Sequence, residues 1–164
     1  MKNTLFAVYN FLNVKKLKKQ ARLVRETAEL LKKYPDREII KIYWNSESLT
    51  ERMSAAVEAI RRSLNINLYN EQTMAALGLA QGFAVEMKTG EGKTFAVAAA
   101  AASLRDTVHI ATVNDYLAER DFKNLKPFFD FLNISCGVNL KGKNKIELYR
   151  KQIVYSSSVN LIFD

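Results

Sequence analysis

At 164 residues the chain has the size of one domain, and 48% hydrophobic residues with only six Gly and two Pro exclude a disordered chain. Cys136 is the only cysteine, which excludes an intramolecular disulfide and a zinc site of several thiolates, and fits a reducing compartment. The net charge of +8 falls almost entirely within residues 1–33, where nine Lys or Arg stand against two Glu. Such a block suggests an acidic partner, either an anionic membrane surface or nucleic acid, although a solvated helix face is an equally simple interpretation.

The apolar stretch at residues 5–12 is too short to span a membrane, which takes about 20 apolar residues. Its basic cluster follows it, whereas a signal peptide is basic before its apolar stretch, so we expect no secretion signal. The next residues predict an amphipathic helix over 13–33, because apolar side chains recur there every three or four positions. These are Val14, Leu17, Ala21, Val24, Ala28 and Leu31. Pro35 should end this helix near Tyr34.

Residues 38–50 are ambiguous, and residues 37–48 suggest nothing beyond a connection. Thr50 is expected to cap a second helix that ends between residues 64 and 67. Beyond residue 83, short apolar runs alternate with helical patterns, an order that predicts a parallel sheet with helices on both faces. The expected strands are 83–87, 108–113, 135–138 and 153–155, and the expected helices are 93–104, 115–132 and 145–150.

A phosphate-binding loop is predicted at Thr89–Thr94, with the sequence TGEGKT, between an expected strand and an expected helix. Gly90 and Gly92 let the backbone approach phosphate oxygens, and the first turn of a helix offers free N–H groups to an anion. Lys93 would reach the β- and γ-phosphates of a nucleotide, and the Thr94 hydroxyl would ligate Mg²⁺. The usual pattern has a further glycine at position 87, where this chain has Met87.

With its flanking residues, Glu86–Thr94 resembles the phosphate loop of the SecA family, in which methionine replaces that glycine. A second segment, Thr112–Asp121, is similar to the family's T-V-N-D-Y-L-A-x-R-D pattern. Tyr69–Gln72 resembles an aromatic-aspartate-x-glutamine element, with Asn70 in place of the aspartate. In that family the glutamine reads adenine, and the amide of Gln72 can both donate to and accept from that base. Residues 55–62 and the basic N-terminal helix are similar more weakly, and 153–164 only in part, which is typical of a divergent or accessory member.

The resemblance implies an α/β fold: a partial P-loop NTPase (RecA-like) parallel sheet with flanking helices, preceded by N-terminal helices. Residues 1–49 would form a basic amphipathic helical segment and 50–164 an incomplete first nucleotide-binding domain. The implied cofactors are ATP and Mg²⁺, with Thr94 as the metal ligand through the nucleotide. We expect the chain to end before the Walker B acidic residues and the second motor domain, so no catalytic set is complete. The implied nucleotide-binding residues are Gln72, Thr89, Gly90, Glu91, Gly92, Lys93 and Thr94.

As a member of this family, the chain would be the ATP-binding part of a motor that drives preprotein export. Its partners would be the Sec translocon channel, preproteins and an anionic membrane surface, and it would be cytoplasmic and peripheral on the inner face of the membrane. One alternative is a stand-alone nucleotide-binding module or decayed paralogue that does not hydrolyse ATP. A nucleic-acid helicase fragment is a further alternative, but residues 114–121 match the translocase pattern, so no nucleic acid is expected. His109 has no second ligand nearby in the sequence and is expected in the core or on a strand surface.

Overall fold

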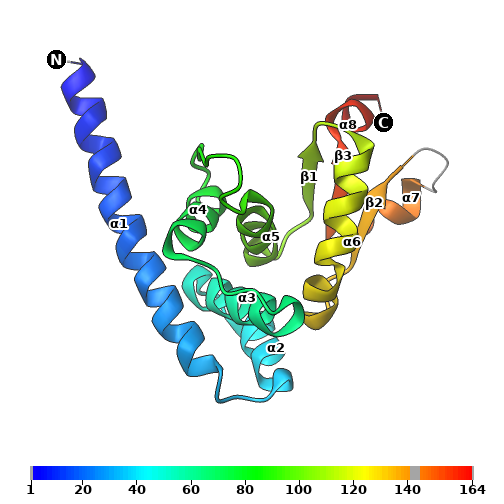
Figure 1. Cartoon of the computed structure of the whole chain (residues 1–164), viewed down its shortest axis with the longest axis horizontal. Coiled ribbons are helices and arrows are strands. Elements are labelled where there is room, and N and C mark those ends of the chain that lie inside the picture. Colours follow the sequence, from blue (N-terminus) through cyan, green and yellow to red (C-terminus); the bar gives the residue numbers. More distant parts are fainter. Residues whose placement is uncertain (1, 141–144, 164) are drawn as a thin grey trace.

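Four helices form the N-terminal half of the chain (Figure 1). The computed structural model describes residues 2–140 and 145–163, with side chains from residue 13 onward. The helices are α1 (Lys2–Leu31), α2 (Asp36–Asn45), α3 (Leu49–Leu64) and α4 (Asn70–Ala80). α1 begins well before the predicted residue 13, because residues 2–31 contain no Gly or Pro that would stop a helix.

The predicted apolar stripe of α1 is buried in its C-terminal part, where Ala21, Val24, Ala28 and Leu31 pack into the core. Val14 is 41% exposed and does not belong to the buried stripe. α1 lies against α3 and α4 and ends in a turn before Pro35, as the proline predicts. The stripe therefore holds this half of α1 on the body of the protein, while the other half extends away from it (Figure 1).

α3 begins one residue before the expected cap, so the prediction of Thr50 as its N-cap is wrong. The Ser48 hydroxyl is the N-cap instead and accepts from the Glu51 backbone N–H at 3.4 Å. Both residue types suit this position, and Ser48 takes it because Leu49 is already helical. The end of the helix is as predicted, at Leu64, followed by Asn65 in the left-handed conformation.

α2 does more than connect, contrary to the expectation for residues 37–48. The Tyr43 hydroxyl, buried in the core, donates to the carbonyl oxygen of Ala102 at 2.6 Å. The Trp44 Nε1–H donates to the carbonyl oxygen of Leu132 at 2.9 Å. Both acceptors lie at the C-terminal ends of later helices, so α2 supplies side-chain donors to these helix ends.

The sheet has three parallel strands in the order β1-β3-β2. They are β1 (Val108–Thr112), β2 (Cys136–Asn139) and β3 (Ile153–Ser157), with Tyr155 of the central strand level with Ile110 and Val138. All five residues of β3 are buried, as expected for a central strand. The sheet is the predicted α/β arrangement, with flanking helices.

Helices lie on both sides of this sheet, although they cover one face only in part. α6 (Asp115–Phe131) packs on the face that carries Tyr155, whose ring lies 6.3 Å from that of Phe129. On the opposite face, α7 (Lys145–Leu148) lies beside β2, and Leu148 fills the space next to Gly137. His109 lies on the exposed surface of β1, beside the ring of Tyr149. α8 (Ser158–Phe163) follows β3.

The predicted strand at residues 83–87 is not formed. Its side chains alternate as in a strand, with Phe83, Val85 and Met87 partly buried and Ala84 and Glu86 exposed. A strand also needs a hydrogen-bonded neighbour, and within the described ranges 2–140 and 145–163 this segment pairs with none. The prediction of a strand here is wrong: the segment is buried on one side without pairing to a neighbouring strand.

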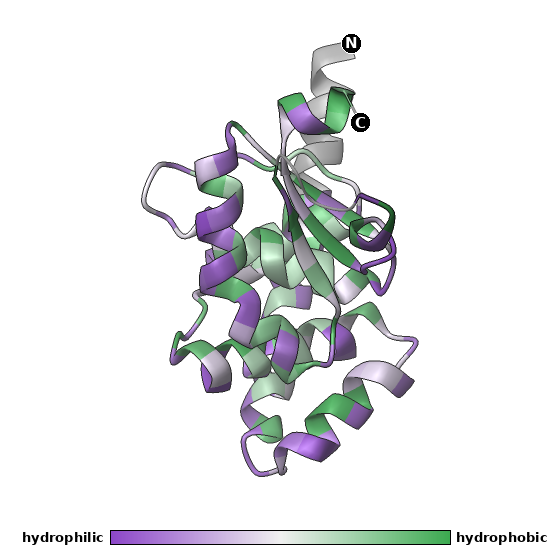
Figure 2. Ribbon diagram, turned by 90° about the vertical axis from the view of Figure 1, so that its right-hand side faces the viewer, coloured by the Kyte–Doolittle hydropathy of each residue, from purple (hydrophilic) through white to green (hydrophobic). Residues whose placement is uncertain are grey.

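The strands and the helices at the centre of the view are mostly hydrophobic, whereas the outer helices mix hydrophilic and hydrophobic residues (Figure 2). One helix of the interior is α5 (Lys93–Leu104), which follows the predicted phosphate loop. α5 is apolar along most of its length, and six of its alanines are buried: Ala96, Ala98, Ala99, Ala100, Ala101 and Ala102. It packs against α4, α3 and α6 and touches β1, so it lies between the helical half and the sheet. This position fixes the helix whose first turn carries the phosphate loop.

Candidate nucleotide site

The predicted phosphate loop is a tight turn that leads directly into α5. Gly90 and Gly92 have φ of +85° and +79°, a region that side chains other than glycine enter at a cost. Gly92 is also the N-cap of α5. A Cβ on Gly92 would lie 2.2 Å from the Gln72 amide nitrogen, so a larger residue there would displace the Gln72 side chain. The two glycines therefore have the backbone geometry that a phosphate cradle requires.

Gln72 joins α4 to this loop through its side-chain amide. Its oxygen accepts from the Tyr69 backbone N–H at 2.9 Å, and its nitrogen donates to the Glu91 carbonyl oxygen at 2.9 Å. The residue is 9% exposed. An amide oxygen has a second lone pair and an amide nitrogen has a second hydrogen. Gln72 can therefore hold the loop and still offer one donor and one acceptor to a base.

The two charged side chains of the loop both bind its own backbone. Lys93 Nζ donates to the carbonyl oxygens of Met87 and Lys88, each at 2.8 Å. The Glu91 carboxylate accepts from the Lys88 N–H at 2.7 Å. Thr94, the second residue of α5, is partly buried next to Lys93. Lys93 is exposed, so its ammonium group can exchange these carbonyls for phosphate oxygens.

Comparison with known proteins identifies the family. A model of the SecA DEAD-like domain matches residues 2–164. The chain belongs to the SecA DEAD-like domain family. The SecA resemblance of the phosphate loop and of Thr112–Asp121 is thereby confirmed.

Three relatives are protein translocase subunits of the SecA type. The SecA subunit of Borrelia garinii subsp. bavariensis is 42% identical over 125 aligned residues, which cover 72% of this chain and 14% of that protein. The SecA subunit of Clostridium beijerinckii is 35% identical over 180 aligned positions, which cover 99% of this chain and 21% of that protein. A SecA 2 subunit of Chlorobium chlorochromatii is 38% identical over 124 aligned residues, which cover 72% of this chain and 19% of that protein. The chain thus spans between 14% and 21% of the length of these relatives.

A candidate residue that the sequence reasoning did not single out is Tyr69, the aromatic residue of the segment that resembles the SecA glutamine element. It lies at the N-cap of α4, three residues before Gln72, and is 71% exposed. A large exposed aromatic ring has the shape and surface to stack on a nucleobase. Its place in the element was the available signal. The neighbouring Asn70 accepts from Arg25 of α1 at 2.7 Å, so α1 also contacts this edge of the site.

The second SecA segment, Thr112–Asp121, lies at the carboxyl end of β1 and forms the start of α6 (Figure 1). The Asn114 side chain caps α6 by accepting from the Leu117 N–H at 2.9 Å, and the Thr112 hydroxyl donates to the Asn114 carbonyl oxygen at 2.8 Å. Asp115 accepts from Asn160 of α8 at 2.9 Å. These polar residues therefore hold the end of the sheet together, and the structure gives them no contact with the phosphate loop.

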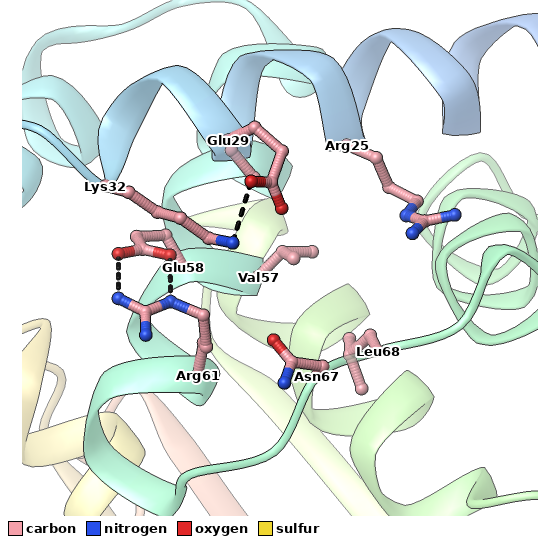
Figure 3. Close-up of a pocket in the computed structure, with 9 residues that line it drawn as sticks. Arg25, Glu29, Lys32, Val57, Glu58, Arg61, Asn67 and Leu68 are labelled. Atoms are coloured by element: carbon pink, nitrogen blue, oxygen red, sulfur yellow. Dashed lines mark hydrogen bonds and ion pairs between the residues drawn. The ribbon is translucent and has the colours of Figure 1, made fainter.

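Two cavities bear on where a ligand can bind. One of about 420 Å³ lies between α1, α4 and residues 83–87 and reaches Glu91 of the loop, a volume in the range of small-molecule sites. The other, between α1 and α3, holds only about 50 Å³ and is lined by charged side chains (Figure 3). Its Glu58 pairs with Arg61, and its Glu29 with Lys32, so these charges satisfy one another.

No group of His, Cys, Asp and Glu side chains suited to a metal ion occurs in residues 13–140 and 145–163. Burial raises the pKa of Cys136 to about 11, so its thiol is neutral at physiological pH. In the described part of the chain, no helix is both long and apolar enough to cross a membrane.

Proposed function

We propose that the chain binds ATP with Mg²⁺ and serves as the nucleotide-binding part of a SecA-type motor that drives preprotein export through the Sec channel. The observation that carries the proposal is the loop. Two glycines at positive φ precede α5, and Lys93 stands at its first position. Bound nucleotide would supply a chain of phosphates for the N–H groups at this helix start.

In this proposal each predicted residue has one task. Lys93 would move from the loop carbonyls to the β- and γ-phosphates, and Thr94 would ligate Mg²⁺. The backbone of Thr89, Gly90, Glu91 and Gly92 would enclose the phosphates. Gln72 would use its remaining donor and acceptor on adenine, with Tyr69 against the ring face. The proposal is supported by the close approach of the Gln72 side chain to Gly92, which brings the amide next to the loop backbone.

Replacing Lys93 tests the nucleotide site. Lys93→Ala is expected to weaken ADP and ATP binding at least tenfold, because one charged hydrogen bond to phosphate contributes about 1.5–3 kcal/mol. Isothermal titration of the 164-residue chain measures the affinity. Lys88→Ala is the matched control, since that side chain is exposed and the turn uses the backbone of Lys88, which alanine keeps. Nucleotide affinity that is equal in wild type and Lys93→Ala would refute the assignment.

We also propose that the basic N-terminal segment faces the membrane, with residues 1–49 as the membrane-facing part and 50–164 as the nucleotide-binding part. Lys15, Lys16, Lys18 and Lys19 are all exposed on α1. Each basic residue near an anionic surface contributes up to about 1 kcal/mol, less the screening by salt. The protein would then work in the cytoplasm, on the inner face of the membrane.

Neutralising these four lysines to glutamine is expected to reduce binding to anionic vesicles by at least tenfold at low salt, as measured by co-sedimentation. The control replaces Lys123 and Lys126, which are exposed on α6, with glutamine. Equal binding to neutral and anionic vesicles, or equal losses in the two variants, would leave the basic face as a solvated surface.

A further inference from the structure

The phosphate loop is closed on itself by Glu91, whose side chain has no task in the proposed nucleotide site. The Glu91 backbone N–H donates to the Lys88 carbonyl oxygen at 3.3 Å, which makes Lys88–Glu91 a four-residue turn. Gly90 is its third residue, where positive φ is required in this kind of turn. The Glu91 carboxylate then folds back and accepts from the Lys88 N–H at 2.7 Å. Backbone and side chain of Glu91 therefore close the same turn.

The charged side chains of Lys93 and Glu91 both bind backbone groups at the start of the loop. Lys93 Nζ binds the carbonyls of Met87 and Lys88, and the Glu91 carboxylate binds an N–H group of the same turn. An oxyanion on a backbone N–H group in a glycine-rich turn is the chemistry by which such loops bind phosphate. In this structure the oxyanion belongs to the protein.

We propose that Glu91 is an internal stand-in for phosphate, which holds the loop closed without nucleotide and lowers its affinity for the phosphate chain. The inference rests on the proposed nucleotide site and adds a regulating residue to it. The backbone of Glu91 is fixed as well, because the Gln72 amide nitrogen donates to its carbonyl oxygen at 2.9 Å. A phosphate chain that enters the loop meets this negative charge and must displace it or bind beside it.

The size of the effect follows from charge and exposure. Glu91 is exposed, so water and salt screen its repulsion, and the effect is moderate. Removing one negative charge several ångströms from a ligand with about three should strengthen binding by about three- to tenfold. Glutamine keeps an oxygen that can accept from Lys88 and preserves the turn. Glu91→Gln therefore removes the charge and leaves the geometry.

Isothermal titration of the 164-residue chain with ADP, inorganic pyrophosphate and adenosine tests the proposal. Glu91→Gln should raise the affinity for ADP and pyrophosphate about three- to tenfold and leave that for adenosine unchanged, because adenosine carries no phosphate. The matched control is Glu86→Gln, an exposed glutamate before the turn. Unchanged or weaker ADP binding in Glu91→Gln, or an equal gain in Glu86→Gln, would overturn the inference.

A second measurement separates this inference from the proposed function. The backbone amide resonance of Lys88, recorded without ligand, should change in Glu91→Gln and stay in place in Glu86→Gln. If the Lys88 amide resonance did not change in Glu91→Gln, the contact on which the inference depends would be absent, and the inference would fail at any measured ADP affinity. ADP binding that requires Lys93 but ignores Glu91 would leave the nucleotide site intact and refute the inference alone. Absence of ADP binding in wild type and Glu91→Gln would refute both.

Discussion

Glu58→Gln is expected to lower the free energy of unfolding by about 3 kcal/mol, at the lower end of the range for breaking a buried ion pair. Glu58 is 1% exposed, and its carboxylate accepts from both Arg61 and Arg62 at 2.6 to 2.7 Å. A glutamine there would turn an N–H group toward guanidinium donors. Both arginines keep some access to water, which limits the loss.

The loss extends beyond one pair because Arg62 also holds α1. Its guanidinium donates to the carbonyl oxygens of Leu31 at 3.1 Å and Tyr34 at 2.8 Å, at the C-terminal end of that helix. Among the described ion pairs, Glu58 is the only partner of Arg62 on α3, and the other partner, Asp36, lies on α2. The variant is therefore expected to loosen the junction between α1 and α3.

The same network predicts how stability depends on pH. Burial alone would raise the pKa of Glu58, but hydrogen bonds and charges of Arg61 and Arg62 outweigh it and lower the pKa below the ordinary value of 4.5. Because the pKa is lower in the folded state, the contribution to stability is complete above the unfolded pKa and lost as pH falls through the folded value. The difference in free energy of unfolding between wild type and Glu58→Gln should therefore become smaller at acidic pH.

Urea unfolding at pH 7 and at pH 3 measures both effects. The matched control is Glu29→Gln, in an i,i+3 pair with Lys32 whose side chains are 65% and 39% exposed. Such exposed pairs contribute about 0 to 1 kcal/mol, so this variant should unfold almost as the wild type does. Equal stability of the Glu58 and Glu29 variants at pH 7 would show that the buried pair is not a net contributor.

The 164-residue chain is expected to bind ATP without turning it over. Lys93 and Thr94 provide a phosphate grip and one ligand for Mg²⁺, whereas phosphoryl transfer also needs carboxylates and a finger arginine, the latter contributing about 10³ to 10⁵ in rate. In the described part of the chain, the strands end at Thr112, Asn139 and Ser157. The acidic residues Asp130 and Glu147 lie within α6 and α7, as the sequence predicted, and so not at a strand end where a Walker B carboxylate would stand.

Phosphate release by the purified chain with Mg²⁺ checks this expectation, with Lys93→Ala as the control for a contaminating ATPase. Release at the same background rate from both proteins is the expected result. Steady turnover in wild type that disappears in Lys93→Ala would contradict it. That outcome would mean that an acidic side chain reaches the loop from a helix rather than from a strand end.

The sequence predicted best where one residue type has one local consequence. Gly90 and Gly92 marked a turn at positive φ, and the alternation after residue 104 predicted the order of helices and strands. The roles of Tyr43 and Trp44 could not be predicted, because each binds a carbonyl more than fifty positions away. The failure of the predicted strand at 83–87 could not be foreseen either, because an apolar run does not show whether a neighbouring strand is present to pair with it.

The site shows the same division. Gln72 was identified from its motif, but its bonds to Tyr69 and Glu91 depend on how α4 meets the loop. Glu58 stands between Val57 and Ala59 in the sequence, where its burial could not be foreseen, and α1 packs across the helix that carries it. Local geometry could thus be predicted, whereas burial by a distant helix could not.

The alanines of α5 determine how much this part of the protein can vary in evolution. Six of them are buried between neighbouring elements, so the backbones approach to the distance that a methyl group allows. Any larger side chain would push α4 or α3 away and shift the loop that α5 carries. Sequence drift along this helix is therefore limited by volume rather than by polarity, and homologues should exchange its alanines mainly for glycine and serine.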